Sequence, residues 1–536
     1  MKSQKLRLLG VVVASVWLSA SAFAQGNSGN APGQNKVEVI ASTNNDRGFV
    51  LRDTPGKPID TSVIKEAKDK RRVPYEDSPS HIDDAAAQTE HRSSVSSNAL
   101  TTPGLGRDGV GVGFPGFTVQ SAPPDTTGVV GATQYVQWVN TSFAVFDKAT
   151  GNVVYGPVPG NTLFTGFGGG CEANNDGDPV VQYDKAANRW VMMQFSVSTT
   201  PYTQCVAVSQ TSDATGAWNR YSFTYTGFND YPKAGVWPDG YYVTYNIFNG
   251  NSFGGSKVCA MDRTKMLAGL AATQQCFQLS TSYGGLLPSD LDGSIQPTTG
   301  APNFVMNFGT NTLNLWKFHV DWATPASSTF TGPTALSVAA FAAACGGGTC
   351  VPQASTNRTL DSLADRLMYR LAYRKFADGH DALVVNHAVK IGNGGAKNTY
   401  SGTRWYEVRD PAGTPTVFQQ SSYAPDNTHR WMGSIAMDKQ GNIALGYSAS
   451  SGTIKPAIRY ATRLAADPLN TLSNETLIIQ GTGAQTGTLS RWGDYSHMSV
   501  DPVDDCTFWF TTEYLKANGS FNWSTRIASF KINGCS

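Results

Sequence analysis

The feature that most constrains the fold is a short pattern that recurs along the chain. It consists of an apolar strand, a polar turn led by aspartate, and a second apolar or aromatic strand. The leading aspartates are Asp147, Asp184, Asp239, Asp378, Asp438 and Asp501. The long interval before Asp378 leaves room for one further copy near residues 302–308. Recurrence at a period of about fifty residues is typical of architectures in which each repeat is one small antiparallel sheet.

Composition agrees with many short strands joined by turns. The chain has 55 Gly and 27 Pro among 536 residues, which favours turns over long helices. Nothing between the copies resembles the crossover helix of roughly 12 residues that parallel strands need. A radial array of small sheets avoids exposed sheet edges by circular repetition. We therefore predict an all-β fold, a β-propeller of antiparallel strands over residues 101–536, with seven blades favoured and six or eight left open.

The first hundred residues divide into two parts. Three basic residues precede an apolar run over residues 8–23, and Ala22-Phe23-Ala24 offers small residues at a cleavage position. This layout predicts a secretory signal peptide at residues 1–24. Residues 25–100 contain no Trp and only Phe49 and Tyr75 as aromatics, which is too little apolar surface to offset the entropy of ordering the chain. We expect a linker or pro-segment there, largely disordered.

The cysteines indicate an oxidising compartment. An even number of them behind a signal peptide predicts disulfides, and sequential pairing is the simplest of the many possible connectivities. No C-x-x-C or H-E-x-x-H motif supports zinc. We therefore expect a protein secreted to the periplasm or the extracellular space. The 8 cysteines are Cys171, Cys205, Cys259, Cys276, Cys345, Cys350, Cys506 and Cys535.

Charge and hydropathy exclude two classes of partner. The chain carries 41 Lys+Arg against 40 Asp+Glu, a net charge of +1, which argues against a nucleic-acid binder. After the signal peptide, no apolar run reaches the roughly 18 residues of a membrane helix. We expect a monomer whose partner is an extracellular glycan or protein.

Ionisable and aromatic residues gather where the innermost strand of each predicted unit begins. In a propeller these strand starts open onto one face of the axial channel, so they are expected to form one charged funnel. The acids are Asp125, Asp178, Asp230 and Asp494, the bases are Lys233, Arg366, Arg430 and Arg491, and the aromatics are Tyr231, Trp431, Trp492 and Tyr495. The competing interpretation is that these groups form ion pairs that join the blades.

Carboxyl groups held close together have pKa values that separate, which supplies an acid and a base for glycoside cleavage. We expect Asp230 and Asp494 to form this pair, with Tyr495 as a third catalytic residue. Arginines bind anionic groups in bidentate geometry, and indole rings stack on sugars. The expected substrate-binding residues are Asp125, Asp178, Tyr231, Lys233, Arg366, Arg430, Trp431, Arg491 and Trp492.

Two oxygen-rich loops are candidates for a structural calcium ion, although no cofactor is firmly indicated. One spans Glu172–Asp178 and the other contains Asp290 and Asp292. The first is not an EF-hand, because Tyr183 stands where that motif requires Glu.

Three segments carry a resemblance to known proteins: Asp230–Lys233, Trp237–Gly240 and Arg491–Ser496. On them, residues 115–535 resemble uncharacterised secreted bacterial propeller proteins that are distantly similar to sialidases and other BNR-repeat proteins. The resemblance implies an arginine trio at Arg366, Arg430 and Arg491, a tyrosine nucleophile at Tyr495 or Tyr369, and Glu513 as its partner. The S-x-D-x-G-x-x-W Asp-box of that family is absent.

These observations lead to one favoured function and one alternative. The favoured function is a secreted propeller that engages extracellular glycan at its charged central funnel and cleaves glycosidic bonds. As an enzyme it would be hydrolase-like or lyase-like. The alternative is a non-catalytic carbohydrate-binding, protein-binding or adhesion module, because propellers host both kinds of function.

Overall fold

The computed structural model describes Met1 and residues 36–58, 73–75, 84–92, 101–119, 121–392, 399–473 and 475–536. Apart from Met1, the expected signal peptide lies outside these residues. Strands dominate, which confirms the all-β prediction. The helical elements are short: α1 (Gly169–Ala173), α2 (Arg263–Ala268), η1 (Leu51–Asp53), η3 (Gly160–Phe164), η4 (Pro325–Ser327) and η5 (Ala344–Gly347). None of the helices in this part of the chain has the length and apolar character needed to cross a membrane.

Four-stranded antiparallel units follow one another along the chain. The first three are β5 (Thr126–Val130), β6 (Gln134–Val139), β7 (Ser142–Asp147) and β8 (Val153–Pro159); β9 (Val180–Asp184), β10 (Arg189–Ser196), β11 (Tyr202–Ser209) and β12 (Trp218–Tyr225); and β13 (Phe228–Val236), β14 (Tyr241–Asn249), β15 (Ser252–Met261) and β16 (Thr273–Gln278). The next two are β17 (Leu287–Asp292), β18 (Asn303–Gly309), β19 (Thr312–His319) and β20 (Thr329–Ser337); and β23 (Met368–Lys375), β24 (Asp381–Ile391), β25 (Tyr400–Arg409) and β26 (Thr416–Tyr423).

The remaining units are β27 (His429–Met437), β28 (Ile443–Ser450), β29 (Ala457–Arg463) and β30 (Thr476–Gln480), and then β31 (His497–Val500), β32 (Thr507–Leu515), β33 (Trp523–Ile532) and β4 (Thr101–Asp108). A small sheet of β21 (Thr349–Val351) and β22 (Leu360–Asp361) lies between two units in the sequence. Strand β17 also pairs in parallel with β23, so their two units form one continuous sheet.

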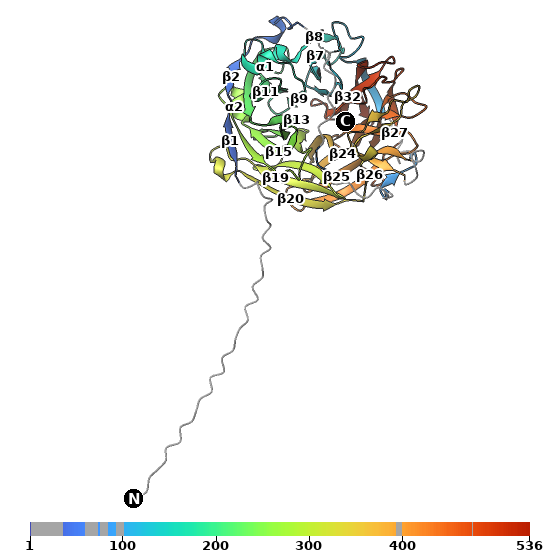
Figure 1. Ribbon diagram of the computed structural model, residues 1–536. Coiled ribbons are helices and arrows are strands. Elements are labelled where there is room, and N and C mark those ends of the chain that lie inside the picture. The colour runs from blue at the N-terminus through green and yellow to red at the C-terminus, as the bar shows by residue number, and fades with distance from the viewer. Residues whose placement is uncertain are drawn as a thin grey trace.

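The first strands of the units surround a common centre. Strand β5 contacts β9, β9 contacts β13, and the series continues through β17, β23, β27 and β31 before returning to β5. Figure 1 shows the result as a ring of sheets in which the colour passes from cyan through green and yellow to red. Because the first strands run side by side, all of them start at one end of the ring axis.

The recurring aspartates form the turns that the sequence pattern indicates. Asp147 accepts a hydrogen bond from the backbone N–H of Thr150 at 2.8 Å in the turn between β7 and β8. Asp438 likewise accepts the backbone N–H groups of Gln440 at 2.9 Å and Asn442 at 3.0 Å. These side chains replace the backbone acceptors that a tight turn lacks, so they stabilise the hairpins.

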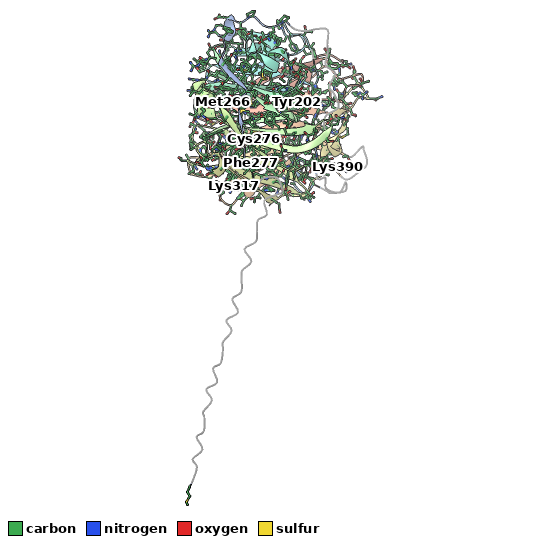
Figure 2. The ribbon with its side chains drawn as sticks, turned by 60° about the vertical axis from the view of Figure 1, so that its left-hand side comes forward. Tyr202, Met266, Cys276, Phe277, Lys317 and Lys390 are labelled. Carbon is green, nitrogen blue, oxygen red and sulfur yellow. A yellow bond between two sulfur atoms is a disulfide. The ribbon has the colours of Figure 1, made fainter. Side chains whose placement is uncertain are left out.

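Four disulfides lie within single units or the loops beside them: Cys171–Cys205, Cys259–Cys276, Cys345–Cys350 and Cys506–Cys535. Cys276, labelled in Figure 2, is on β16 and is directly opposite Cys259 on β15. The sequential pairing expected from the sequence is confirmed. Disulfides of this kind are consistent with an oxidising compartment.

The segment before residue 101 corrects one expectation. Strand β1 (Glu38–Ala41) extends the sheet at β16, β2 (Asn44–Arg47) extends the sheet at β12, and β3 (Ala87–Gln88) pairs with β26. The prediction of a largely disordered linker is therefore wrong for these residues. Added edge strands are stabilised by backbone hydrogen bonds, which need few apolar side chains and leave little trace in composition.

Candidate functional site

Strained backbone recurs just before two of the first strands and, in β13, where its pairing with β14 is irregular. Asp125, Asp178 and Tyr231 have φ values of 45°, 46° and 54°, and each is 53 residues from the next. Glycine has the same left-handed conformation at Gly285, 54 residues further on. A non-glycine residue in this region is held there by its surroundings, and such positions concentrate at functional sites. The repeated conformation directs side chains from several units toward the axis.

These side chains form a cluster at that end of the axis, which we call the axial cluster. Its members are Asp125, Asp178, Tyr231, Lys233, Arg366, Arg491, Asp494 and Tyr495. The backbone N–H of Asp494 donates to Asp125 Oδ1 at 3.0 Å, and the hydroxyl of Tyr231 donates to the carbonyl of Asp494 at 3.2 Å. These contacts link the starts of β5, β13 and β31, which lie in different units, so the cluster crosses the axis.

Two carboxyl groups of the cluster have raised pKa values. Asp125 is buried and accepts a hydrogen bond from Asn140 Nδ2 at 2.5 Å. Burial and the nearby charge of Asp178 raise the pKa of Asp125 well above its usual range. Burial also raises the pKa of Asp178, although Lys233 and Arg491 oppose this shift. Two carboxyls that repel each other's charge are the arrangement that supplies one acid and one ionised partner.

Lys233 is the innermost cation of the cluster, and its side chain is 0% exposed. Its Nζ donates to the carbonyl of Pro232 at 2.8 Å and lies 3.5 Å and 3.8 Å from the ring centroids of Tyr231 and Tyr495. Burial lowers the pKa of the amine to about 7, while the charges of Asp178 and Asp125 oppose the shift. The amine therefore changes its protonation state near neutral pH.

The two arginines of the cluster are already bound by carboxylates. Arg366 Nε lies 2.9 Å from Asp365 Oδ1, and its guanidinium carbon lies 4.5 Å from the ring centroid of Tyr231. Arg491 forms an ion pair with Asp494. The charge of Asp230 acts on both Lys233 and Arg366, which places Asp230 beside the cluster.

Three of the expected site residues lie elsewhere. Arg430 is fully buried and is bound by Glu475 and Asp426, each at 3.0 Å. The rings of Trp431 and Trp492 are 0% exposed and their centroids are 5.8 Å apart. The prediction that these two indole rings stack on a sugar is therefore wrong, because neither ring has a face open to a ligand.

Two tyrosines and a buried glutamate named in the sequence analysis support the cluster, as does one residue that the sequence did not indicate. The hydroxyl of Tyr495 donates to the carbonyl of Pro179 at 2.9 Å, and that of Tyr369 donates to the carbonyl of Ala234 at 2.9 Å. Glu513 is buried behind the loop at Gly493, and burial raises its pKa well above the usual range. Asn140, which binds Asp125, lies in an ordinary turn that no motif distinguishes.

The two oxygen-rich loops use their carboxylates for other contacts. Glu172 accepts the backbone N–H groups of Gly166 and Gly168, each at 2.8 Å. Asp290 and Asp292 are bound by Arg370, at 2.9 Å and 2.5 Å. Among the residues that the structure describes, no group of three or more His, Cys, Asp or Glu side chains is arranged to hold a metal ion.

Comparison with known proteins gives only distant likenesses. No protein-family model matches the chain, and no curated protein matches it. The polysaccharide lyase Uly1 is 10% identical, with 83% of this chain and 99% of that chain covered and a TM-score of 0.36. The α-L-arabinofuranosidase Arb93A from Fusarium graminearum is 8% identical, with 84% and 99% covered and a TM-score of 0.32.

A sialidase from Trypanosoma rangeli is among the similar structures, at 11% identity, with 67% of this chain and 55% of that chain covered and a TM-score of 0.29. Likenesses at TM-scores of this size do not assign an activity to this chain. The function therefore has to be argued from the axial cluster itself.

Proposed function

We propose that this chain is a secreted β-propeller of seven blades that engages extracellular glycan at the axial cluster and cleaves glycosidic bonds there. One observation carries the proposal. Carboxyl groups from the starts of different first strands meet at the ring axis, beside cations and tyrosines, with raised pKa values. The four disulfides support the secreted location, and we expect a monomer.

The proposed roles follow from the electrostatics. Asp125, whose pKa is raised well above its usual range, is the acid that donates a proton to the glycosidic oxygen. Asp178 is only partly buried and is the carboxylate that stabilises positive charge developing on the sugar ring. Its partial exposure places it toward the ligand, while Asp125 lies deeper.

The residues expected to act as acid and base take other positions in this proposal. Asp494 holds Asp125 through its backbone N–H and pairs with Arg491 through its side chain. Tyr495 and Tyr231 enclose Lys233. Asp230 and Arg366 form the side of the cluster next to β23. These residues position the reacting carboxyls.

A non-catalytic glycan-binding module is the second candidate, and one observation favours it. Both arginines of the cluster are already bound by neighbouring carboxylates, and several of the charged groups are buried. A cluster whose arginines are already paired can hold a ligand without reacting with it. Binding without turnover would support this alternative.

The test combines a glycan array with an assay for newly formed reducing ends. We expect the wild-type protein to bind and cleave at least one glycan, and Asp125→Asn to lower kcat by about 100-fold or more, because the donated proton is lost. Asp147→Asn is the matched control, since Asp147 lies in an outer turn. Cleavage by Asp125→Asn at the wild-type rate would exclude Asp125 as the proton donor.

A further inference from the structure

Lys233 is a buried amine whose hydrogen-bonding capacity is largely unused. A protonated amine offers three N–H donors. In the part of the chain that the structure describes, Nζ uses one of them, on the carbonyl of Pro232, and makes no ion pair. The two arginines of the same cluster each bind a carboxylate. Burying a cation without a close carboxylate lowers the stability of the fold. The position of Lys233 therefore points to a role other than structural support.

The surroundings of Lys233 accept both the charged and the neutral amine. The ring faces of Tyr231 and Tyr495 attract a cation through their negative π-electron clouds. They also form an apolar enclosure that suits a neutral amine. An amine held in an ion pair would instead be kept in its protonated form.

The titratable and charged groups that face the amine come from several strand starts. Asp125 and Asp178 approach from β5 and β9, Asp230 and Tyr231 lie on its own strand β13, Arg366 precedes β23, and Arg491 and Tyr495 precede β31. Asp178, Asp125 and Asp230 favour the protonated amine, whereas burial and Arg366 favour the neutral amine. The opposing influences bring the pKa of Lys233 to about 7.

We propose that Lys233 is the general base of this site, and that its neutral amine takes a proton from a water molecule bound between Nζ and the carboxyl groups of Asp125 and Asp178. The lone pair of the neutral amine accepts one hydrogen of the water, and the carboxylate of Asp178 supplies an acceptor for the second. This role rests on the proposed glycoside cleavage and adds the group that activates the nucleophile.

The proposed step balances without a further reactant. An O–H bond of water breaks, an N–H bond forms on Lys233, and the oxygen uses the remaining electron pair to bond to the anomeric carbon. The bond from that carbon to the leaving oxygen breaks, and the leaving oxygen takes the proton of Asp125. Lys233 then returns its proton to Asp125, which restores both groups.

The first test needs no glycan and uses thermal unfolding of the full chain between pH 6 and pH 10. The unfolded amine has a pKa of about 10.4, so the unfolded state binds more protons than the folded state between about pH 7 and pH 10. Wild-type stability therefore gains from Lys233 as pH rises through this window. We expect Lys233→Met to have a higher Tm than the wild type at pH 7, and this difference to shrink toward pH 10.

Lys185→Met is the matched control. Lys185 pairs with Asp292 at 2.5 Å near the other end of the first strands, so its replacement is expected to lower Tm throughout this pH range. A difference between Lys233→Met and wild type that stays constant from pH 6 to pH 10 would overturn the proposal, because the amine would then keep its proton in the folded protein.

The second test measures kcat against pH on a glycan that the wild-type protein cleaves. We expect the wild-type kcat to rise through about pH 7, Lys233→Arg to lose at least 100-fold, and Lys233→Ala to be rescued by added primary amines at rates that depend on the pKa of the amine. Dependence on amine pKa is diagnostic, since simple filling of a cavity would not produce it.

The outcomes separate the two proposals. Wild-type activity in Lys233→Arg would overturn the base role and leave glycoside cleavage intact, because arginine cannot release its proton at these pH values. Absence of turnover by the wild-type protein on every glycan tested would overturn the proposed cleavage and the base role together.

Discussion

The two ends of the ring axis use the same strands and the same kinds of residue in different ways. At the strand starts, the axial cluster contains the amine of Lys233, which lies between two tyrosine rings, and carboxyl groups with raised pKa values. Further along the same strands lies a distal network of Lys185, Asp290, Asp292 and Arg370. There Arg370 binds both aspartates, and Lys185 binds Asp292 at 2.5 Å.

The electrostatic consequence is opposite at Asp292 and Asp125. Burial alone would raise the pKa of Asp292, but Arg370 and Lys185 hold that pKa well below its usual range. At Asp125 burial prevails, and it also raises the pKa of Asp290, although Arg370 and Lys185 oppose that shift. The distal network thus pairs each of its aspartates with a close cation, whereas in the described part of the chain Asp125, Asp178 and Lys233 of the axial cluster have shifted pKa values and no close ion pair. Burial is common to both ends, and close pairing distinguishes them.

The largest expected effect is the loss of the distal network. Arg370→Met leaves Asp290 and Asp292 buried without their main partner, and we expect a decrease of about 3–5 kcal/mol in the free energy of unfolding. Urea denaturation measures it. Arg52→Ala is the control, since its pair with Asp213 is exposed and is expected to contribute less than about 1 kcal/mol. Equal losses in the two variants would remove the distinction between the ends.

The next effect contrasts equivalent substitutions at the two ends. We expect Asp125→Asn to keep or raise Tm at pH 7, because the folded carboxyl already prefers its neutral form, and Asp292→Asn to lower Tm. The pH dependence has opposite sign as well. Asp292 stabilises above the unfolded pKa of about 3.9, and this contribution is lost as pH falls.

For Asp125 the folded pKa is raised, so its contribution is complete below about pH 3.9 and is lost as pH rises. Thermal unfolding of both variants and wild type from pH 3 to pH 8 measures these trends. The comparison fails if the two aspartates shift stability in the same direction with pH.

The smallest effect is expected at Asp494, whose side chain is partly exposed. Asp494→Asn weakens the pair with Arg491 but keeps the backbone N–H that binds Asp125. We expect a change below about 1 kcal/mol in stability and about a tenfold loss of kcat/KM. The measurement is turnover of the glycan found by the array. A loss as large as that of Asp125→Asn would give Asp494 a direct role in the reaction.

Much of the architecture could be predicted from the sequence, because a hairpin turn is determined by residues that are close together in the chain. The recurring aspartates indicated antiparallel sheets, and charged residues before the first strands indicated where side chains would meet. Asp125, Asp178, Lys233 and Asp494 were found in this way. Their contacts across the axis depend on the curvature of the ring, which no local pattern specifies.

The residues that were misplaced show what a sequence pattern cannot supply. Trp431 and Trp492 pack their rings against each other in the core, and a contact between distant strands leaves no pattern in the sequence around either residue. Edge strands β1 and β2 were missed for a different reason. Their stability comes from backbone pairing with β16 and β12, to which amino-acid composition contributes little.

The outer strand β4 has a consequence for biosynthesis. It pairs with β33, so one sheet is made from the beginning and the end of the ring-forming chain. A ribosome, or a channel that exports the chain from its N-terminus, delivers β33 last. The ring can therefore close only after nearly the whole polypeptide has emerged, and until then β4 has no partner strand. Formation of the Cys506–Cys535 disulfide beside β33 would then hold this last strand in place.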